Sequence, residues 1–159
     1  MEKLKDKTPE QALARLMAIC SKSEKSSGDA LRLMWGWGIA PAERDKIVRK
    51  LIAERFIDDA RYAAAFVREK TRLNGWGAHK IGAALSAKGV ARAIINDALG
   101  EIDPRAAQER LDRYLRTKLS RLSGTPYEIR EKLMRYGASL GYDYETVSDA
   151  IGKLIREES

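Results

Sequence analysis

The sequence contains very few residues of the kinds that build metal and redox sites. It has one cysteine, Cys20, and one histidine, His79, among its 159 residues. A single cysteine excludes an internal disulfide and a cysteine-based zinc site, and it fits a reducing, cytosolic compartment. A single histidine excludes sites built on two histidines, and we interpret His79 as solvated or capping rather than catalytic. We therefore expect no metal and no cofactor.

Long apolar runs and phosphate-binding loops are also missing. The longest apolar run, residues 33–40, includes two glycines, whereas a membrane span needs about 20 residues. The N-terminal residues lack the apolar core of a signal peptide. Residues 74–80 come nearest to a phosphate loop, but their spacing is wrong. The adjacent Asp58 and Asp59 have no second carboxylate motif beside them. We expect a cytoplasmic protein that is not an enzyme and does not enter a membrane.

The composition is that of a folded protein with an excess of positive charge. Apolar residues make up 44% and charged residues 33%, and the net charge is +7. These fractions exclude a disordered chain and a membrane protein. The positive charge favours anionic partners, which include nucleic acid, an acidic protein groove and an anionic membrane.

Apolar residues recur at helical spacing along the whole chain, and no alternating run indicates a strand. Nine helical stripes follow one another, so we predict an all-α fold. Three helix starts have strong local signals. Thr8 and Thr125 each precede a proline, and Ser26 precedes an acidic residue three positions later. Each is predicted to cap the helix that follows.

One pattern occurs three times in the sequence. It consists of two apolar residues and a glycine, each four residues after the one before. The sets are Ala30–Met34–Gly38, Ile81–Leu85–Gly89 and Ile129–Leu133–Gly137. Each pair places two side chains on one helix face, and each glycine can end its helix in the left-handed conformation. We predict three tandem three-helix repeats, residues 1–57, 58–103 and 104–159, forming an elongated, curved array. The alternative is that any helical protein shows such patterns.

Basic residues are segregated in the middle of the sequence. Residues 60–92 hold seven basic residues and one acid, Glu69. A second basic stretch follows, in which Arg113 and Arg116 share a helix face. A basic strip of this kind would meet phosphates or acidic side chains, and the alternative is a solvated helix surface. The candidate partner- or DNA-binding residues are Arg68, Arg72, Lys80, Lys88, Arg92, Arg113 and Arg116.

All three tryptophans lie beside glycines. Trp35 and Trp37 belong to the sequence WGWG, and Trp76 belongs to NGWG. We expect them to fill the junctions between helices, whereas the alternative is stacking on a base or anchoring a partner protein. Tyr62, Phe66 and Tyr114 lie on apolar stripes and are expected in the core.

Residues 56–67, FIDDARYAAAFV, resemble the central signature of the RecX family of recombinase regulators. Further similarity follows at Gly77, Lys80, Ile81, Leu85, Lys88, Gly89 and Val90. The signature residues to which we assign a structural role are Phe56, Ile57, Asp58, Asp59, Tyr62 and Gly89. Either aspartate can cap the helix that follows. Asp29–Ala30 and the WGWG turn depart from the usual family pattern.

The resemblance implies a non-enzymatic modulator of homologous recombination and DNA repair within the SOS response. Such a protein would bind the RecA recombinase, usually as its filament on single-stranded DNA, and damp its activities. We expect a monomer whose partners are the RecA filament and, as an additional partner, single-stranded DNA. Two alternatives stay open: a nucleic-acid-binding helical-repeat protein independent of RecA, and a helical adaptor for another protein.

Overall fold

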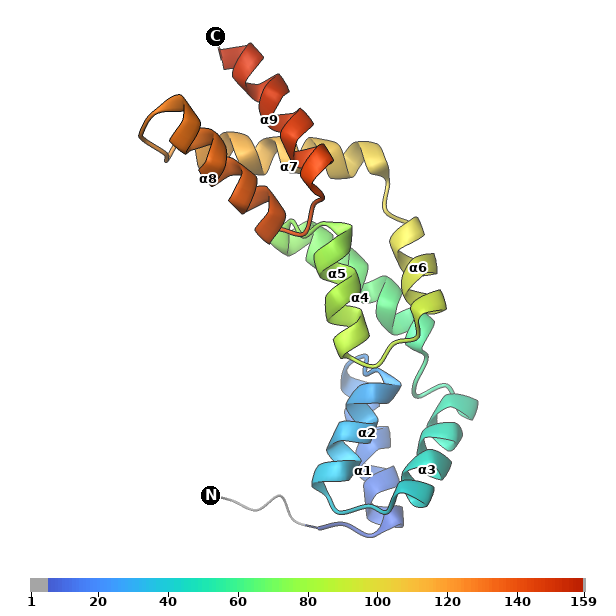
Figure 1. Ribbon diagram of the computed structural model, residues 1–159. Helices are drawn as coiled ribbons and strands as arrows, with labels where there is room; N and C mark the ends of the chain where they lie inside the picture. The colour runs from blue at the N-terminus through green and yellow to red at the C-terminus, as the bar shows by residue number, and fades with distance from the viewer. Residues whose placement is uncertain (1–5, 159) are drawn as a thin grey trace. The chain divides into compact units, whose positions relative to one another are not determined.

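The computed structural model describes residues 6–158, and every regular element in this part of the chain is an α-helix. The nine helices are α1 (Pro9–Lys22), α2 (Ser27–Gly36), α3 (Pro41–Ala53), α4 (Asp59–Asn74), α5 (Ala78–Ala87), α6 (Arg92–Gly100), α7 (Pro104–Leu119), α8 (Pro126–Ser139) and α9 (Tyr144–Glu158) (Figure 1). The predicted all-α class is confirmed. Residues 1–5 and 159, at the outer ends of the first and third predicted repeats, lie outside the described residues.

The local signals at three helix starts act as expected. The side chain of Thr8 accepts a hydrogen bond from the backbone of Gln11 and forms a complete capping box with it. Ser26 forms the same arrangement with Asp29. Thr125 accepts from the backbone of Glu128. These caps satisfy N–H groups that the first turn of a helix would otherwise leave without partners.

The chain divides into two compact units. The first extends to residue 65 and includes residues 85–95, and the second comprises residues 66–84 and the chain from residue 96. Helices α1–α3 belong wholly to the first unit and α7–α9 wholly to the second. The middle helices α4, α5 and α6 are each divided between the units.

Helices α1, α2 and α3 of the first unit surround an apolar core. Leu16, Met34 and Leu51, one from each helix, are fully buried, and Ile57 joins them from the segment after α3. Burying each of these side chains contributes roughly 1.5–3 kcal/mol. The core thereby holds the residues that lead into α4.

Helices α7, α8 and α9 of the second unit pack around a core of the same kind. Leu111 and Leu115 of α7, Leu133 of α8 and Ile151 of α9 are fully buried. Figure 1 shows these three helices, in yellow-orange to red, crossing one another at the C-terminal end of the chain. The burial of Leu133, and of Leu85 in α5, agrees with the apolar pairs from which the repeat was predicted.

The repeat predicts that Gly38, Gly89 and Gly137 each end the second helix of a repeat. The structure agrees at two of these glycines and differs at the third. Gly38 and Gly89 have positive φ values of 73° and 80°, as the repeat predicts. The prediction for Gly137 is wrong: it lies inside α8, where a Cβ atom would come 2.6 Å from Cγ1 of Val147. The turn is made by Gly141, with φ 98°. The reason is length, because α8 has 14 residues whereas α2 and α5 have 10.

Candidate functional site

The signature segment that begins at Phe56 joins α3 to α4 by backbone and side-chain contacts. The N–H groups of Phe56 and Ile57 both donate to the carbonyl of Leu51. Ile57 is buried in the first core and Phe56 packs against it. Asp58 caps α4, since its Oδ1 accepts from the backbone N–H of Arg61 at 3.0 Å. These residues set where α4 begins and how it leaves the first core.

Asp59 makes contacts across the first unit. Its carboxylate accepts hydrogen bonds from the backbone N–H and the hydroxyl of Ser27, at 2.8 and 2.5 Å. The start of α4 is thereby fastened to the start of α2. The neighbouring Tyr62 is buried, with 9% of its surface exposed. Both aspartates of the signature therefore accept hydrogen bonds from groups within the chain, which gives each of them a structural role.

A close backbone contact, which we call the first junction, joins residues 26–29 to the turn at residues 87–89. The hydroxyl of Ser26, fully buried, donates to the carbonyl of Lys88 at 2.8 Å. Gly28 lies so close to this turn that an added Cβ atom would come 2.8 Å from the carbonyl carbon of Lys88 and 3.0 Å from Cα of Gly89. Only glycine allows the two backbones to approach to this distance.

Asp29 is the electrostatic centre of the first junction. Its carboxylate pairs with Arg32 at 2.6 Å and with Lys88 at 3.5 Å, and its Oδ2 accepts from the backbone of Ser26. Burial on its own raises the pKa of Asp29. The hydrogen bonds from Arg32 and Ser26, together with the charge of Lys88, outweigh this effect, so its pKa lies below the usual value. The ionised carboxylate thus stabilises the junction.

A second junction joins residues 75–80 to the turn at residues 139–142, within the second unit. The backbone N–H of Gly77 donates to the carbonyl of Leu140 at 2.7 Å, and that of His79 donates to Gly141 at 3.1 Å. A Cβ atom on Gly77 would come 2.6 Å from the carbonyl oxygen of Gly141. His79 therefore has a backbone contact at this turn, while its side chain is exposed.

The two junctions use equivalent acceptor carbonyls, although the donor is the hydroxyl of Ser26 in the first and the backbone N–H of Gly77 in the second. In each, the residue before the second helix of one predicted repeat donates to the carbonyl just before the turn glycine of the next. Ser26 reaches Lys88 in this way and Gly77 reaches Leu140. The equivalent carbonyl of the first repeat, that of Trp37, accepts from the backbone N–H of Lys7 at 3.1 Å. This hydrogen bond joins the segment before α1 to the turn after α2.

The three tryptophans have different environments, which the sequence pattern did not separate. Trp37 is buried in the first core. Trp76 is half-buried at the second junction, where the ammonium groups of Lys70 and Lys80 lie 5.0 and 4.6 Å from its ring centre. The prediction that the tryptophans fill junctions is wrong for Trp35, which is 75% exposed. Trp35 and Trp37 are two residues apart, about 200° around a helix, so they face different sides.

Three of the seven candidate basic residues have partners within the chain. Lys88 pairs with Asp29 at the first junction. The Lys80 ammonium donates to the carbonyl of Ser139 at 3.1 Å and lies over Trp76. Arg116 pairs with Glu157 of α9 at 2.9 Å. These contacts give each of the three a structural role, which the charge pattern alone did not indicate.

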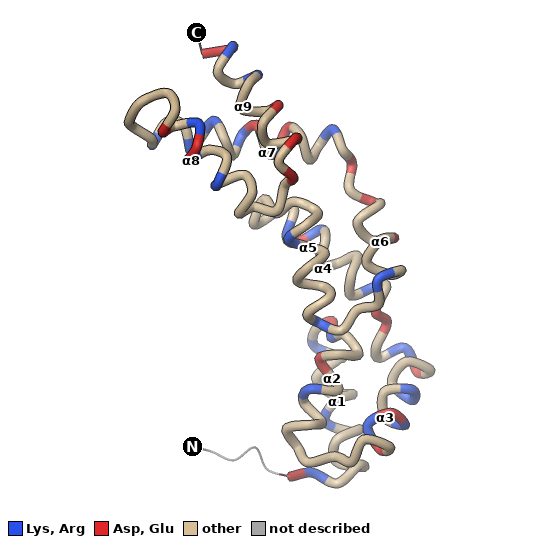
Figure 2. The backbone as a smooth tube through the Cα atoms, in the orientation of Figure 1, with Lys and Arg blue, Asp and Glu red and all other residues tan. Residues whose placement is uncertain are grey.

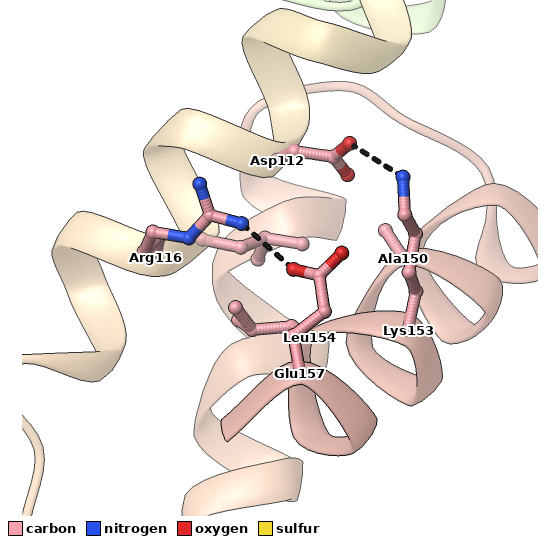
Figure 3. Close-up of a pocket in the computed structure, with 7 residues that line it drawn as sticks. Asp112, Arg116, Ala150, Lys153, Leu154 and Glu157 are labelled. Carbon is pink, nitrogen blue, oxygen red and sulfur yellow. Dashed lines mark hydrogen bonds and ion pairs between the residues drawn. The ribbon is translucent and has the colours of Figure 1, made fainter. Parts of the chain in front are cut away.

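Arg116 forms part of a network between α7 and α9 (Figure 3). Asp112 pairs with Lys153 at 3.9 Å, one helical turn from the Arg116–Glu157 pair. The space that these side chains enclose is about 10 Å³, enough for about one water molecule. The network joins the two helices and offers no room for a ligand.

The other four basic residues are exposed, and no hydrogen bond or ion pair is found for their side chains within residues 6–158. They are Arg68 and Arg72 on α4, Arg92 at the start of α6, and Arg113 on α7. Figure 2 shows in blue where lysines and arginines lie along the backbone. Arg68 and Arg72 are four residues apart and share one face of α4. Arg92 places its charge at the positive end of a helix dipole, where a cation gains nothing from the helix. Among the seven candidates, these four arginines are the ones whose side chains are exposed and make no hydrogen bond or ion pair with the part of the chain that the structure describes.

The described residues contain no group of three or more His, Cys, Asp or Glu side chains that could hold a metal ion. None of the helices in this part of the chain combines the length and the apolar character needed to cross a bilayer.

Known proteins resemble this chain in sequence. A family model described as "RecX, second three-helix domain" matches residues 58–99. The "Regulatory protein RecX" of Clostridium botulinum (strain Eklund 17B / Type B) is 32% identical over 140 residues, which cover 86% of this chain and 64% of that protein. The protein of the same name from Prosthecochloris aestuarii is 26% identical over 152 residues, covering 96% and 99%. The chain thus spans less than two thirds of the first relative's length, 64%, and nearly all of the second's.

Solved structures resemble the chain in fold. The crystal structure of RecX from Lactobacillus salivarius aligns with a TM-score of 0.82, at 20% identity, over 92% of this chain and 96% of the other. A second structure, of "regulatory protein RecX", aligns with a TM-score of 0.81. The solved structures show that this chain has the all-helical fold of RecX proteins. In sequence the chain is similar to regulatory proteins of the RecX family.

Proposed function

We propose that this protein binds the RecA recombinase as its filament on single-stranded DNA and lowers the filament's activity without hydrolysing ATP. The observation that carries the proposal is the family, because the sequence relatives are regulatory proteins named RecX. The net charge of +7 and the four exposed arginines support an anionic partner. The filament would offer such a partner through acidic protein surface or through DNA.

The proposal assigns the contact to Arg68, Arg72, Arg92 and Arg113. Lys80, Lys88 and Arg116 could also reach a partner, but a change at any of them would disturb a junction or the α7–α9 network as well. The exposed arginines are therefore the informative positions. Their effect should weaken as salt is added, because exposed charges are screened over about 10 Å at 0.1 M.

The test is a titration of RecA ATPase and strand exchange at fixed RecA and single-stranded DNA, at two salt concentrations. The wild-type protein should lower both activities at low salt. The double variant Arg68→Glu/Arg72→Glu should inhibit at least about tenfold less well, which corresponds to a loss of about 1.4 kcal/mol in binding. Unchanged RecA activity with the wild-type protein at low salt would refute the proposal.

A matched control is available on α3. Lys46 and Lys50 are also exposed and four residues apart, and each pairs only with a glutamate of its own helix region. The variant Lys46→Glu/Lys50→Glu has the same change in charge but lies outside the candidate residues. It should inhibit RecA nearly as well as the wild type. Equal losses in both double variants would indicate a response to net charge rather than a specific surface.

The alternative is a nucleic-acid-binding protein that acts independently of RecA. Comparing the protein's affinity for bare single-stranded DNA with its affinity for the RecA filament distinguishes the two functions. Binding to bare single-stranded DNA as tight as binding to the filament, with a steep salt dependence, would favour that alternative. Tighter binding to the filament would favour the RecA regulator. Circular dichroism of every variant must first match that of the wild type, since long basic side chains also cover apolar surface.

A further inference from the structure

An open pocket of about 420 Å³ lies beside the first junction, within the first unit. Pockets that bind small ligands measure about 300–1,000 Å³, so this one has room for a small charged group. Among the described residues, three cations and one carboxylate line it, which gives the lining a net charge of +2. The lining residues are Lys25, Asp29, Arg32, Leu33, Ala87 and Lys88.

The carboxylate of this pocket is covered, whereas the cations that pair with it face outward. Asp29 has 14% of its side chain exposed, against 55% for Arg32 and 44% for Lys88. The Arg32 guanidinium uses two of its five N–H donors, one for Asp29 and one for the carbonyl of Ala87 at 3.0 Å. These two hydrogen bonds hold the guanidinium in place at the pocket, and its other donors find no partner within residues 6–158.

Lys25 adds a positive charge that the pocket does not balance. Its side chain makes no hydrogen bond or ion pair with the residues that the structure describes. The one carboxylate, that of Asp29, is already shared by Arg32 and Lys88. Like charges gathered in one pocket repel one another, and an anion placed among them would remove this repulsion.

We propose that this pocket binds a phosphate group. A phosphate monoester carries nearly two negative charges at pH 7 and three acceptor oxygens, which matches a lining with three cations and a net charge of +2. The fork of Arg32 would donate to two of the oxygens, and the ammonium groups of Lys25 and Lys88 would contact the others. A carboxylate is less suitable, because it brings only one negative charge to these three cations.

The test is a titration of the ¹⁵N-labelled full-length protein with sodium phosphate, followed by ¹H–¹⁵N NMR. Sodium chloride is exchanged for phosphate so that the ionic strength stays constant. The backbone signals of residues 25–33 and 87–88 should shift saturably, while those of α3 should stay in place. A small drift of all signals, with no saturation at the pocket, would overturn the proposal.

A matched pair of variants at Ala87 places the binding in this pocket. Ala87 is exposed and lines the pocket, and Ala87→Glu and Ala87→Gln introduce side chains of equal size that differ in charge. The added carboxylate should weaken phosphate binding at least about tenfold relative to Ala87→Gln. Equal affinities of these two variants, both shown by circular dichroism to be folded, would overturn the proposal.

Lys25→Gln gives a second test that leaves the first junction intact, because Lys25 takes no part in its contacts. The loss of one partly exposed cation should weaken phosphate binding about threefold. The control is Lys46→Gln on α3, which removes the same charge from an exposed position outside the pocket and should leave the affinity unchanged. Equal affinities of Lys25→Gln and Lys46→Gln would contradict the assignment of the pocket.

The phosphate could belong to the backbone of single-stranded DNA or to a free phosphorylated small molecule. Trp35 bears on this choice, because it is 75% exposed and follows Arg32 by three residues on α2. Side chains at this spacing are neighbours on a helix surface. A base attached to the bound phosphate would therefore find an exposed indole ring beside it on which to stack.

Binding of a thymidine oligonucleotide, without RecA, distinguishes the two sources. If Ala87→Glu binds the oligonucleotide more weakly than Ala87→Gln, the phosphate is that of DNA, and Trp35→Ala should bind it about tenfold more weakly than the wild type. If the two Ala87 variants bind it equally, the source is a free phosphate compound. The inference goes beyond the proposed function, and failure of the wild-type protein to inhibit RecA would leave the phosphate result as it stands.

Discussion

The first junction can be tested with the substitution Gly28→Ala. Helix propensity predicts that this change raises the free energy of unfolding, whereas the close backbone contact predicts that it lowers it. Gly28 lies in the first turn of α2, and its φ is not positive, so alanine fits the local conformation. Replacing glycine by alanine within a helix usually stabilises by about 0.5–1 kcal/mol. At this position, however, the added methyl group would overlap the carbonyl of Lys88.

The magnitude follows from what must move. The overlapping atoms belong to the backbone of Lys88 and Gly89, which cannot rotate away as a side chain can. Overpacking of this kind costs about 1–3 kcal/mol. Separation of the two segments would also lengthen the Ser26–Lys88 hydrogen bond, worth about 0.5–1.5 kcal/mol. After subtraction of the gain in helix propensity, Gly28→Ala should lower the free energy of unfolding by about 1–3 kcal/mol.

Urea unfolding followed by circular dichroism measures this change. The control is Gly152→Ala in the interior of α9, where the nearest atom to an added Cβ, Nη1 of Arg156, lies at an ordinary 3.5 Å. This variant should be as stable as the wild type or more stable, by up to about 1 kcal/mol. A Gly28→Ala variant as stable as Gly152→Ala would refute the close backbone contact at the first junction.

Two further predictions concern stability. Asp29→Asn should lower the free energy of unfolding at pH 7, and the difference from the wild type should shrink as the pH falls below about 4. Because folding lowers the pKa of Asp29, the ionised carboxylate stabilises the protein at pH values above its unfolded pKa, and this stabilisation is lost as the carboxylate is protonated in acid. Urea unfolding at pH 7 and pH 3 measures the effect. The same difference in free energy of unfolding between the wild type and Asp29→Asn at both pH values would contradict this. Leu133→Ala should cost about 2–5 kcal/mol, since Leu133 is fully buried. The exposed Leu73→Ala is the control and should change stability by less than about 0.5 kcal/mol. Similar losses in these two leucine variants would contradict the described core.

Features that depend on neighbouring residues were predictable from the sequence. A helix cap needs only a side-chain oxygen and an N–H three residues later, so Thr8, Ser26 and Thr125 were identified correctly. The all-α class follows from apolar spacing at the helical period, which also placed Leu85 and Leu133 in the interior. The family was indicated by a contiguous block of twelve residues, 56–67, which needs no tertiary contact to be read.

The length of α8 was not predictable from the same pattern. Gly137 has the spacing of a turn glycine, but the helix continues to Ser139 and the turn falls at Gly141. The choice is made by packing, because Gly137 lies against Val147 of α9. Trp35 and Trp37 likewise have the same local sequence, and only the position of the first core buries one and exposes the other.

The sequence by itself determined the helices, their caps and the supply of positive charge. Only the tertiary structure decided which charges are available to a partner. Ser26 and Lys88 are 62 residues apart, and Arg116 and Glu157 are 41 residues apart. No local pattern links residues so distant, because their contacts exist only once the helices have packed. Packing engages Lys88 and Arg116 within the protein and leaves Arg68 and Arg72 exposed to solvent.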